Sequence, residues 1–258
     1  MNIKKKIKDI KLLRNVYFLT QPLRSYFSPN LIKLLKQYIW FFKTLREFKK
    51  VRNENIVDIE YFPCLFDNTS YTPVDAVYFY QDTWAAKKIF ELKPKHHVDV
   101  GSSIMTMGIL SQFVPITMVD IRPIQLKLKG LNFIKGSILN LPFKDRSLES
   151  ISSLCVVEHI GLGRYGDDID VYGSEKAIKE LKRVVKKGGV ILLSVPVDKQ
   201  NKVYFNAHRT FTRDYILKLF QDEFELVEEK YQYGMILYDR YDPKKGFGTG
   251  LYMFRRKI

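Results

Sequence analysis

Short apolar runs alternate with segments of helical periodicity from about residue 75 to the end of the chain. Such runs, bounded by polar residues or glycine, are typical of buried strands, and the intervening periodicity is typical of helices. The expected strands are 96–100, 116–120, 131–136, 150–157, 190–197, 224–233 and 250–256, and the expected helices are 77–92, 104–113, 174–187 and 212–220. The pattern predicts an α/β fold with a mostly parallel seven-stranded sheet and helices on both faces.

The N-terminal part has a different pattern. Residues 31–50 place apolar side chains on one helical face and lysines opposite, which predicts a basic amphipathic helix. We therefore expect a helical extension over 1–55 and a domain over 56–258. Because no apolar run approaches the length that spans a bilayer, neither a transmembrane helix nor a signal peptide is expected.

Charge is distributed unevenly along the chain. Of the net charge of +15, +12 lies before residue 53, where fourteen Lys and Arg face two acidic residues. The remaining near-neutral part argues against a nucleic-acid partner, which would require a basic groove around the site. Cys64 and Cys155 are the two cysteines, and their spacing predicts neither a disulfide nor a metal site. A cytoplasmic location is the expectation.

Small and acidic residues follow the first expected strands. Asp99, Gly101, Ser102 and Ser103 form a strand-to-helix turn, and Asp120 ends the next strand. This is a nucleotide-binding arrangement, because a glycine turn lets the backbone approach a ligand and the later acid can bind ribose hydroxyls. Serine and threonine replace the later glycines, which favours S-adenosylmethionine over a dinucleotide. Ile121, Ser137, Ile138 and Val157 complete the expected cofactor residues, at the ends of the second, third and fourth strands.

Six motifs in order carry a resemblance to a known family: DVGSS, DIRP, GSILNLPF, VVEHIGLGRYGD, LKRVVKKGGVILLSVPV and FNAHRTF. Over about residues 75–258 the chain resembles the class I S-adenosylmethionine-dependent methyltransferases, specifically the DUF268 group. The resemblance implies a Rossmann-like methyltransferase fold, S-adenosylmethionine as cofactor, Asp120 on the ribose and the Gly101 turn beside the methionine part. Members of the group often resemble parts of surface-polysaccharide pathways, which suggests a carbohydrate acceptor for methylation.

Polar loops follow the fourth and fifth strands, where ligands of open parallel sheets bind. Either His159 or His208 could accept a proton from a hydroxyl acceptor. Glu158 and Asp167 could orient a histidine, whereas Arg164 and Arg209 could bind a phosphate or carboxylate. Gly161, Gly163 and Gly166 would let the first loop fold tightly or move as a lid.

Three classes of function remain open from the sequence. The leading hypothesis is an O-methyltransferase acting on a small polar acceptor, such as a sugar hydroxyl or a phosphorylated metabolite. The alternatives are a catalytically silent scaffold with the same fold and, less favoured, an RNA methyltransferase. The basic arm could pack on the domain or on a second copy in a homodimer, or bind the anionic inner face of a membrane. His96 and His97 are expected to be structural strand-entry residues, and Trp84 a core residue.

Overall fold

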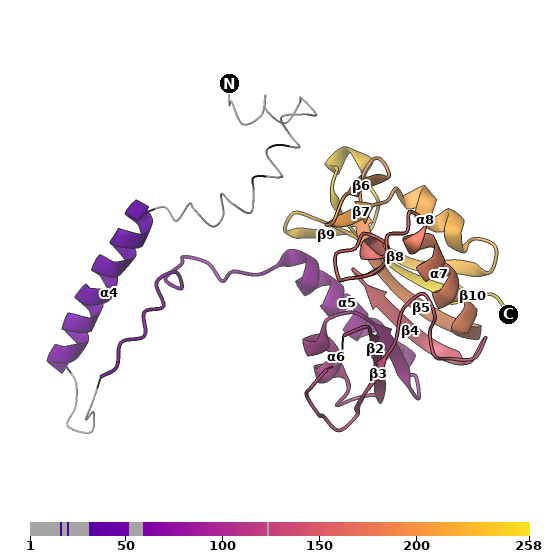
Figure 1. Cartoon of the computed structure of the whole chain (residues 1–258), viewed down its shortest axis with the longest axis horizontal. Coiled ribbons are helices and arrows are strands. Elements are labelled where there is room, and N and C mark those ends of the chain that lie inside the picture. The colour runs from indigo at the N-terminus through magenta and orange to yellow at the C-terminus, as the bar shows by residue number, and fades with distance from the viewer. Residues whose placement is uncertain (1–15, 17–19, 21–30, 52–58, 123) are drawn as a thin grey trace. The chain divides into compact units, whose positions relative to one another are not determined.

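The computed structural model describes residues 16, 20, 31–51, 59–122 and 124–258 (Figure 1). The chain forms two compact units, Met1–Pro73 and Val74–Ile258. The predicted domain boundary at residue 55 lies outside the described residues and stays a prediction.

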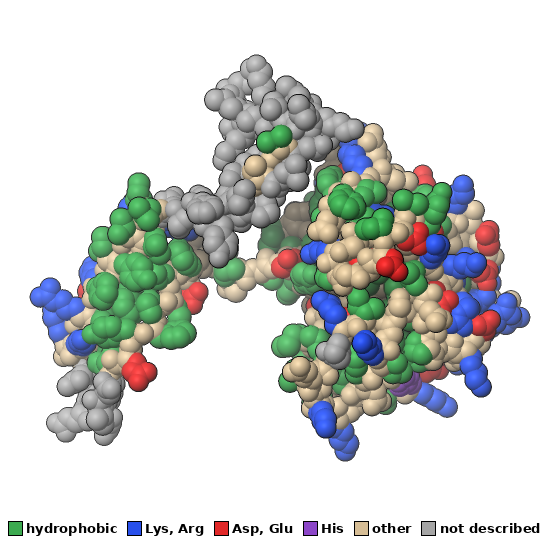
Figure 2. Space-filling model, viewed as in Figure 1, with side chains coloured by type: hydrophobic (Ala, Val, Ile, Leu, Met, Phe, Trp, Pro, Cys, Tyr) green, Lys and Arg blue, Asp and Glu red, His purple; other side chains and the backbone are tan. Residues whose placement is uncertain are grey.

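The first unit contains the predicted amphipathic helix as α4, Leu31–Val51. Figure 2 shows hydrophobic side chains gathered on one face of this helix, with Lys and Arg side chains beside them. Aromatic residues that follow the helix contact it within the same unit: the ring of Tyr61 lies 6.4 Å from that of Phe41, and Lys49 lies over it at 5.3 Å. No helix in the described part of the chain combines the length and apolar character needed to cross a membrane.

The second unit is built on an eight-stranded sheet in the order β3-β2-β1-β4-β5-β10-β8-β9. Its strands are β1 His97–Val100, β2 Ile116–Asp120, β3 Leu131–Lys135, β4 Leu148–Leu154, β5 Val185–Val197, β8 Phe224–Tyr233, β9 Ile236–Tyr238 and β10 Gly248–Arg256. Strands β1 to β5 are parallel, and β10 runs antiparallel to β5 and β8. The predicted mostly parallel sheet is confirmed, with all seven expected strands present.

Three short strands were not predicted. Strand β9 extends the sheet to eight, while β6, Lys202–Tyr204, and β7, His208–Thr210, form a separate hairpin. Each has three residues, so its pairing depends on the neighbouring strand more than on its own hydrophobic pattern.

Helices cover both faces of the sheet, as predicted (Figure 1). The helices α5, Ala76–Leu92, and α6, Ile104–Leu110, pack on one apolar cluster that includes Trp84. The helices α7, Gly173–Val184, and α8, Arg213–Phe220, pack on the other. Alternating side chains of β5 separate the two clusters, because Leu192 belongs to the first and Leu193 to the second.

The end of α7 differs from the expectation. The helix was expected to continue to residue 187, but it stops at Val184, and β5 begins at Val185. The Val185 side chain is fully buried, and its backbone pairs with Leu148 of β4. Sheet pairing and burial of a β-branched residue therefore override the helical pattern.

Candidate active site

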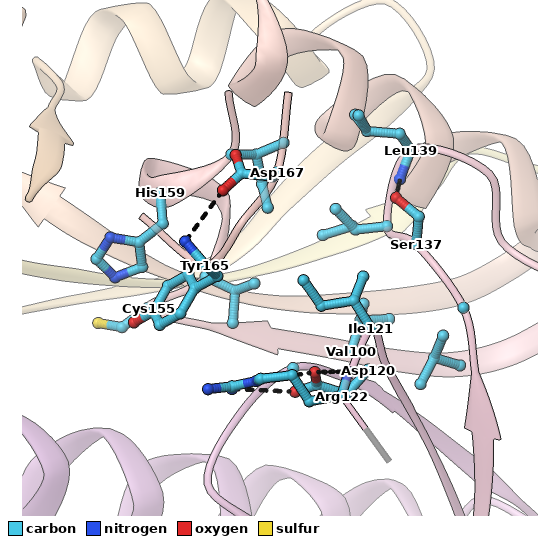
Figure 3. A pocket seen from close by; sticks show the side chains of 16 residues that line it. Val100, Asp120, Ile121, Arg122, Ser137, Leu139, Cys155, His159, Tyr165 and Asp167 are labelled. Atoms are coloured by element: carbon cyan, nitrogen blue, oxygen red, sulfur yellow. Dashed lines mark hydrogen bonds and ion pairs between the residues drawn. The ribbon is translucent and has the colours of Figure 1, made fainter. Parts of the chain in front are cut away.

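A pocket opens beyond the carboxyl ends of the parallel strands, where the strand order reverses between β1 and β4 (Figure 3). This is the position at which open α/β sheets bind ligands. The lining residues come from the ends of β1 to β4 and from the loop after β4: Val100, Gly101, Val119, Asp120, Ile121, Arg122, Gly136, Ser137, Ile138, Leu139, Cys155, Val156, His159, Ile160, Tyr165 and Asp167. Five predicted cofactor residues therefore lie together: Gly101, Asp120, Ile121, Ser137 and Ile138.

The turn after β1 requires glycine. Gly101 has φ +71°, and a Cβ there would lie 3.1 Å from Cγ1 of Val156. Because glycine has no side chain, the backbone of this turn can pack closely against the chain after β4. The same backbone lies at the pocket surface.

Asp99 lies outside the pocket lining and fixes this turn from beneath. The fully buried carboxylate accepts hydrogen bonds from the backbone N–H of Ser102 at 3.1 Å, from its hydroxyl at 2.7 Å and from Ser152. Burial raises the pKa of Asp99 to about 6 despite these bonds. Ser103 caps α6 by accepting from the N–H of Thr106. The polar groups of Asp99, Ser102 and Ser103 thus shape the turn.

His97 extends the network beneath the turn. Its ring nitrogens lie 2.8 Å from the Ser150 hydroxyl and 2.9 Å from that of Ser152, which in turn donates to Asp99. Complete burial lowers the pKa of His97 to about 3, so the imidazole is neutral. The sequence indicated a structural role but gave no sign of this link to the turn, since Ser150 and Ser152 belong to another strand.

Asp120 ends β2 at the pocket edge. Its Oδ1 accepts the backbone N–H of Arg122 at 2.8 Å, and the Arg122 guanidinium lies 3.4 Å from both carboxylate oxygens (Figure 3). On the far wall, Ser137 accepts the N–H of Leu139 at 3.2 Å and tightens the turn after β3. Sequence reasoning missed Arg122, although it stands in the DIRP motif that carried the resemblance.

After β4, the valine that lines the pocket is Val156, one position before the expected Val157. Cys155 has φ +53°, and Val156 then lines the pocket while Val157 is fully buried in the core. Val157 is thus packed away from the pocket, and its assignment to the cofactor stays a prediction. The unusual backbone at Cys155 is not visible in the sequence.

The loop from residue 160 to 171 is held in one conformation. Asp167 accepts the N–H of Gly161 at 2.6 Å and that of Tyr165 at 3.2 Å. Burial acts to raise the pKa of Asp167, but these backbone hydrogen bonds outweigh it and the pKa is lowered. The carboxylate therefore organises the loop that carries Tyr165.

Arg209 corrects one expectation. It was expected to bind an anionic group of the acceptor, but it is buried and donates to the carbonyl oxygens of Ile160 and Asp170 and to more distant Val171. Its hydrogen bonds clamp the two ends of the loop together. A guanidinium used in this way is not available to a ligand.

His159 stands at one end of the pocket with a defined tautomer. Its Nδ1 lies 2.6 Å from the carbonyl oxygen of Ala207. Because a carbonyl only accepts, Nδ1 carries the proton, and in the neutral ring Nε2 presents a lone pair. Burial, together with the positive charge of Arg164, lowers the pKa of His159 to about 4, although the bond to Ala207 opposes this. The imidazole is therefore neutral and basic at Nε2 near pH 7.

Glu158 is buried beside this imidazole. Its Oε1 lies 3.7 Å from Nε2 of His159, and its Oε2 has no hydrogen-bond partner among the described residues. Burial raises the pKa of Glu158 to about 8, so the side chain is mostly a neutral acid at pH 7. Such a buried polar atom is uncommon in folded proteins, and Glu158 lies outside the pocket lining.

His208 has different surroundings. Its ring centroid lies 5.1 Å from that of Tyr204 and 5.6 Å from that of Phe247. Burial and then the charge of Arg164 lower its pKa. His208 lies outside the pocket lining, yet it follows Ala207, which contacts His159. The two predicted bases are thus brought close together, and their environments favour His159.

Tyr165 is a site residue that sequence reasoning missed. The centroid of its ring lies 4.9 Å from the guanidinium of Arg122, 5.1 Å from that of Arg164 and 5.6 Å from the centroid of the His159 ring. The one available signal was its place among three glycines in the loop. The ring links the Asp120 side of the pocket with the His159 side (Figure 3).

Comparison with solved structures identifies the class of fold. A "putative sarcosine dimethylglycine methyltransferase" from Galdieria sulphuraria has a TM-score of 0.53 at 14% identity, covering 69% of this chain and 86% of that one. The YcgJ protein of Bacillus subtilis has a TM-score of 0.50 at 14% identity, covering 70% and 99%. The second unit therefore has the Rossmann-like fold of the class I methyltransferases, as predicted.

Sequence comparison then identifies the family match. Residues 139–232 match the family described as "Caenorhabditis protein of unknown function, DUF268", so the predicted resemblance is confirmed over those residues. A "putative methyltransferase" of Encephalitozoon cuniculi (strain GB-M1) is 35% identical over 66 residues, or 26% of this chain. The match spans 28% of that relative's length.

Proposed function

We propose that this protein is an S-adenosylmethionine-dependent methyltransferase that methylates a hydroxyl of a small polar acceptor. The observation that carries the proposal is a single pocket with the Gly101 turn and the Asp120 carboxylate at one side and the His159 imidazole at the other. The name of the relative from Encephalitozoon cuniculi, a putative methyltransferase, supports the same activity.

The residues present fit the cofactor. The Gly101 turn has no side chain to block a close ligand, and Asp120 offers two acceptor oxygens to a ribose diol. Ile121 and Ile138 provide apolar surface for an adenine ring. When bound, S-adenosylmethionine would supply an electrophilic methyl group and become a neutral thioether.

His159 provides the base that a hydroxyl acceptor needs. In the proposed reaction, the acceptor oxygen forms a bond to the methyl carbon as the carbon–sulfur bond breaks, and the hydroxyl proton passes to Nε2 of His159. The Ala207 carbonyl holds Nδ1–H and so keeps the lone pair at Nε2. The low pKa of the imidazole keeps it unprotonated before the reaction.

A sugar hydroxyl of a surface-polysaccharide precursor is the acceptor that we favour. Tyr165, Tyr204 and Phe247 are exposed aromatic rings around the two histidines, and their flat faces could pack on a pyranose ring. The acceptor would be a soluble intermediate of the cytoplasm.

Calorimetric titration with S-adenosylmethionine and S-adenosylhomocysteine tests the cofactor. We expect Asp120→Asn to weaken binding by at least about tenfold, because hydrogen bonds to a charged group contribute about 1.5–3 kcal/mol. Asp168→Asn, at an exposed loop position, is the matched control and should bind as the wild type does. No binding by the wild type would contradict the proposal and favour a non-catalytic scaffold.

A further inference from the structure

Arg164 is an exposed cation that lies outside the pocket lining and beside His159, which lines the pocket. Its Nη1 donates to the Ala207 carbonyl at 3.0 Å and lies 3.3 Å from Nδ1 of His159. Its guanidinium also contacts the Tyr165 ring at 5.1 Å. Both nearby histidines have lowered pKa values, and the Arg164 charge contributes to each.

In the part of the chain that the structure describes, this charge has no carboxylate partner. Arg183, Arg213 and Arg256 each form ion pairs with glutamates, whereas within the described residues no acidic oxygen lies within 4.0 Å of the Arg164 guanidinium. The Asp167 carboxylate on the same loop is directed to backbone N–H groups. Glu158 is buried as a mostly neutral acid.

The guanidinium is also held in place. The Tyr165 ring contacts both Arg164 and Arg122, and Arg122 pairs with Asp120. One donor of Arg164 is used by Ala207, which leaves other N–H groups of the planar fork for a ligand. A fixed guanidinium with free donors matches the geometry of phosphate and carboxylate oxygens.

We propose that Arg164 binds an oxyanion, a phosphate or carboxylate group, carried by the methyl acceptor. The identification of this ligand as the acceptor rests on the proposed function, in which the reacting hydroxyl faces Nε2 of His159. The anionic group would then lie on the Nδ1 side of the same imidazole. This arrangement narrows the acceptor class to phosphorylated or carboxylated sugars and excludes neutral ones.

Inorganic phosphate is the probe for this site, and the four histidines of the chain are the reporters. The imidazole signals of the full chain are followed by NMR during phosphate titration at constant ionic strength. A bound anion offsets the Arg164 charge, so the signals of His159 and His208 should shift saturably and their pKa values should rise. Glu158 and Asp167 also lie near His159. Neither residue is substituted in these experiments, so both are present in every titration.

His96 provides a reference inside the molecule, because it precedes β1 at the amino ends of the parallel strands, whereas the pocket lies at their carboxyl ends. We expect Arg164→Gln to weaken the phosphate response by about tenfold or more, and Arg164→Lys to weaken it less. Arg146→Gln, an exposed substitution before β4, is the matched control and should respond as the wild type does. Thermal unfolding by circular dichroism confirms that each variant is folded.

A wild type without a saturable response, or an Arg164→Gln variant with the wild-type response, would overturn the anion site. The calorimetric titration separates this failure from that of the proposed function. Cofactor binding without a phosphate response removes the anion site alone. A phosphate response without cofactor binding supports an oxyanion site and contradicts the methyltransferase proposal.

Discussion

Burial shifts the pKa values of individual side chains in this site in opposite directions. His159 and Glu158 are adjacent in the sequence, and burial moves the pKa of the histidine down to about 4 and that of the glutamate up to about 8. Both are therefore mostly uncharged at neutral pH, whereas Arg164 and Asp167 on the following loop are charged. A neutral imidazole can accept a proton at pH 7, and its pKa near 4 makes it a weaker base than a free histidine.

The role of His159 predicts a specific kinetic result. Replacing it by alanine should lower turnover by about 10²- to 10⁴-fold, the usual contribution of a general base, while cofactor binding is retained. His208→Ala should have a smaller effect, since its ring packs between Tyr204 and Phe247. With a pKa near 4, wild-type kcat/KM should not fall through His159 protonation when the pH is lowered from 7 to 5. Wild-type turnover by His159→Ala would show that another group takes the proton.

The raised pKa of Glu158 predicts that the stability of the folded protein depends on pH. Its pKa is raised from 4.5 to about 8 on folding, so between these values the folded state keeps a proton that the unfolded state releases. The free energy of unfolding should therefore decrease as the pH rises across this window, by up to about 1.4 kcal/mol per pH unit. Glu158→Gln cannot ionise and should lose this component.

Urea denaturation at a series of pH values from 5 to 8 measures this effect. The stability of Glu158→Gln relative to the wild type should increase steadily with pH. Glu225→Gln, at an exposed position of β8, is the control, and its curve should stay parallel to that of the wild type. A parallel curve for Glu158→Gln would mean that the buried carboxyl ionises normally.

At the level of elements, the loop between β4 and α7 connects the two sides of the site. The loop begins at Gly161, which has φ +81°. Within the loop, Asp167 accepts the backbone N–H of Gly161, and Arg209 from β7 binds carbonyl oxygens at both ends of the loop. These interactions make the loop a fixed wall that positions Arg164 and Tyr165. The positive φ values of Gly161, Gly163 and Gly166 fit tight folding, and movement of the loop as a lid stays a prediction.

Two glycines of this loop provide a matched pair of substitutions. Gly166 has φ +82° with open space around a Cβ, so Gly166→Ala should cost only the left-handed backbone penalty of about 1–2 kcal/mol. At Gly161 a Cβ would also collide with the Asp170 carbonyl, which Arg209 binds. Gly161→Ala should therefore be clearly more destabilising in urea denaturation. Equal costs for the two variants would show that the loop relaxes freely.

At the scale of the whole molecule, the second unit carries the complete pocket, and the first contributes a basic amphipathic helix. Six Lys and Arg residues of α4 accompany its exposed apolar side chains, a combination that suits an anionic membrane surface. Membrane contact, packing on the domain and packing on a second copy remain the three predicted roles for this arm.

The sequence by itself determined the order of the main strands and helices and placed the Gly101 turn and Asp120 at one pocket. Strand and helix patterns, the Gly101 turn and Asp120 are local features, because each depends on residues within one strand and its following turn. Their positions at the carboxyl ends of β1 and β2 followed from the parallel topology alone.

The tertiary structure decided what the other polar side chains contact. Arg209 was expected at the acceptor and instead clamps a loop about forty residues earlier in the chain. The tautomer of His159 depends on the carbonyl of Ala207, and the burial of Glu158 depends on packing among several elements. Such environments are created when distant segments meet, so the surrounding dielectric and the hydrogen-bond partners of these side chains exist only in the folded chain.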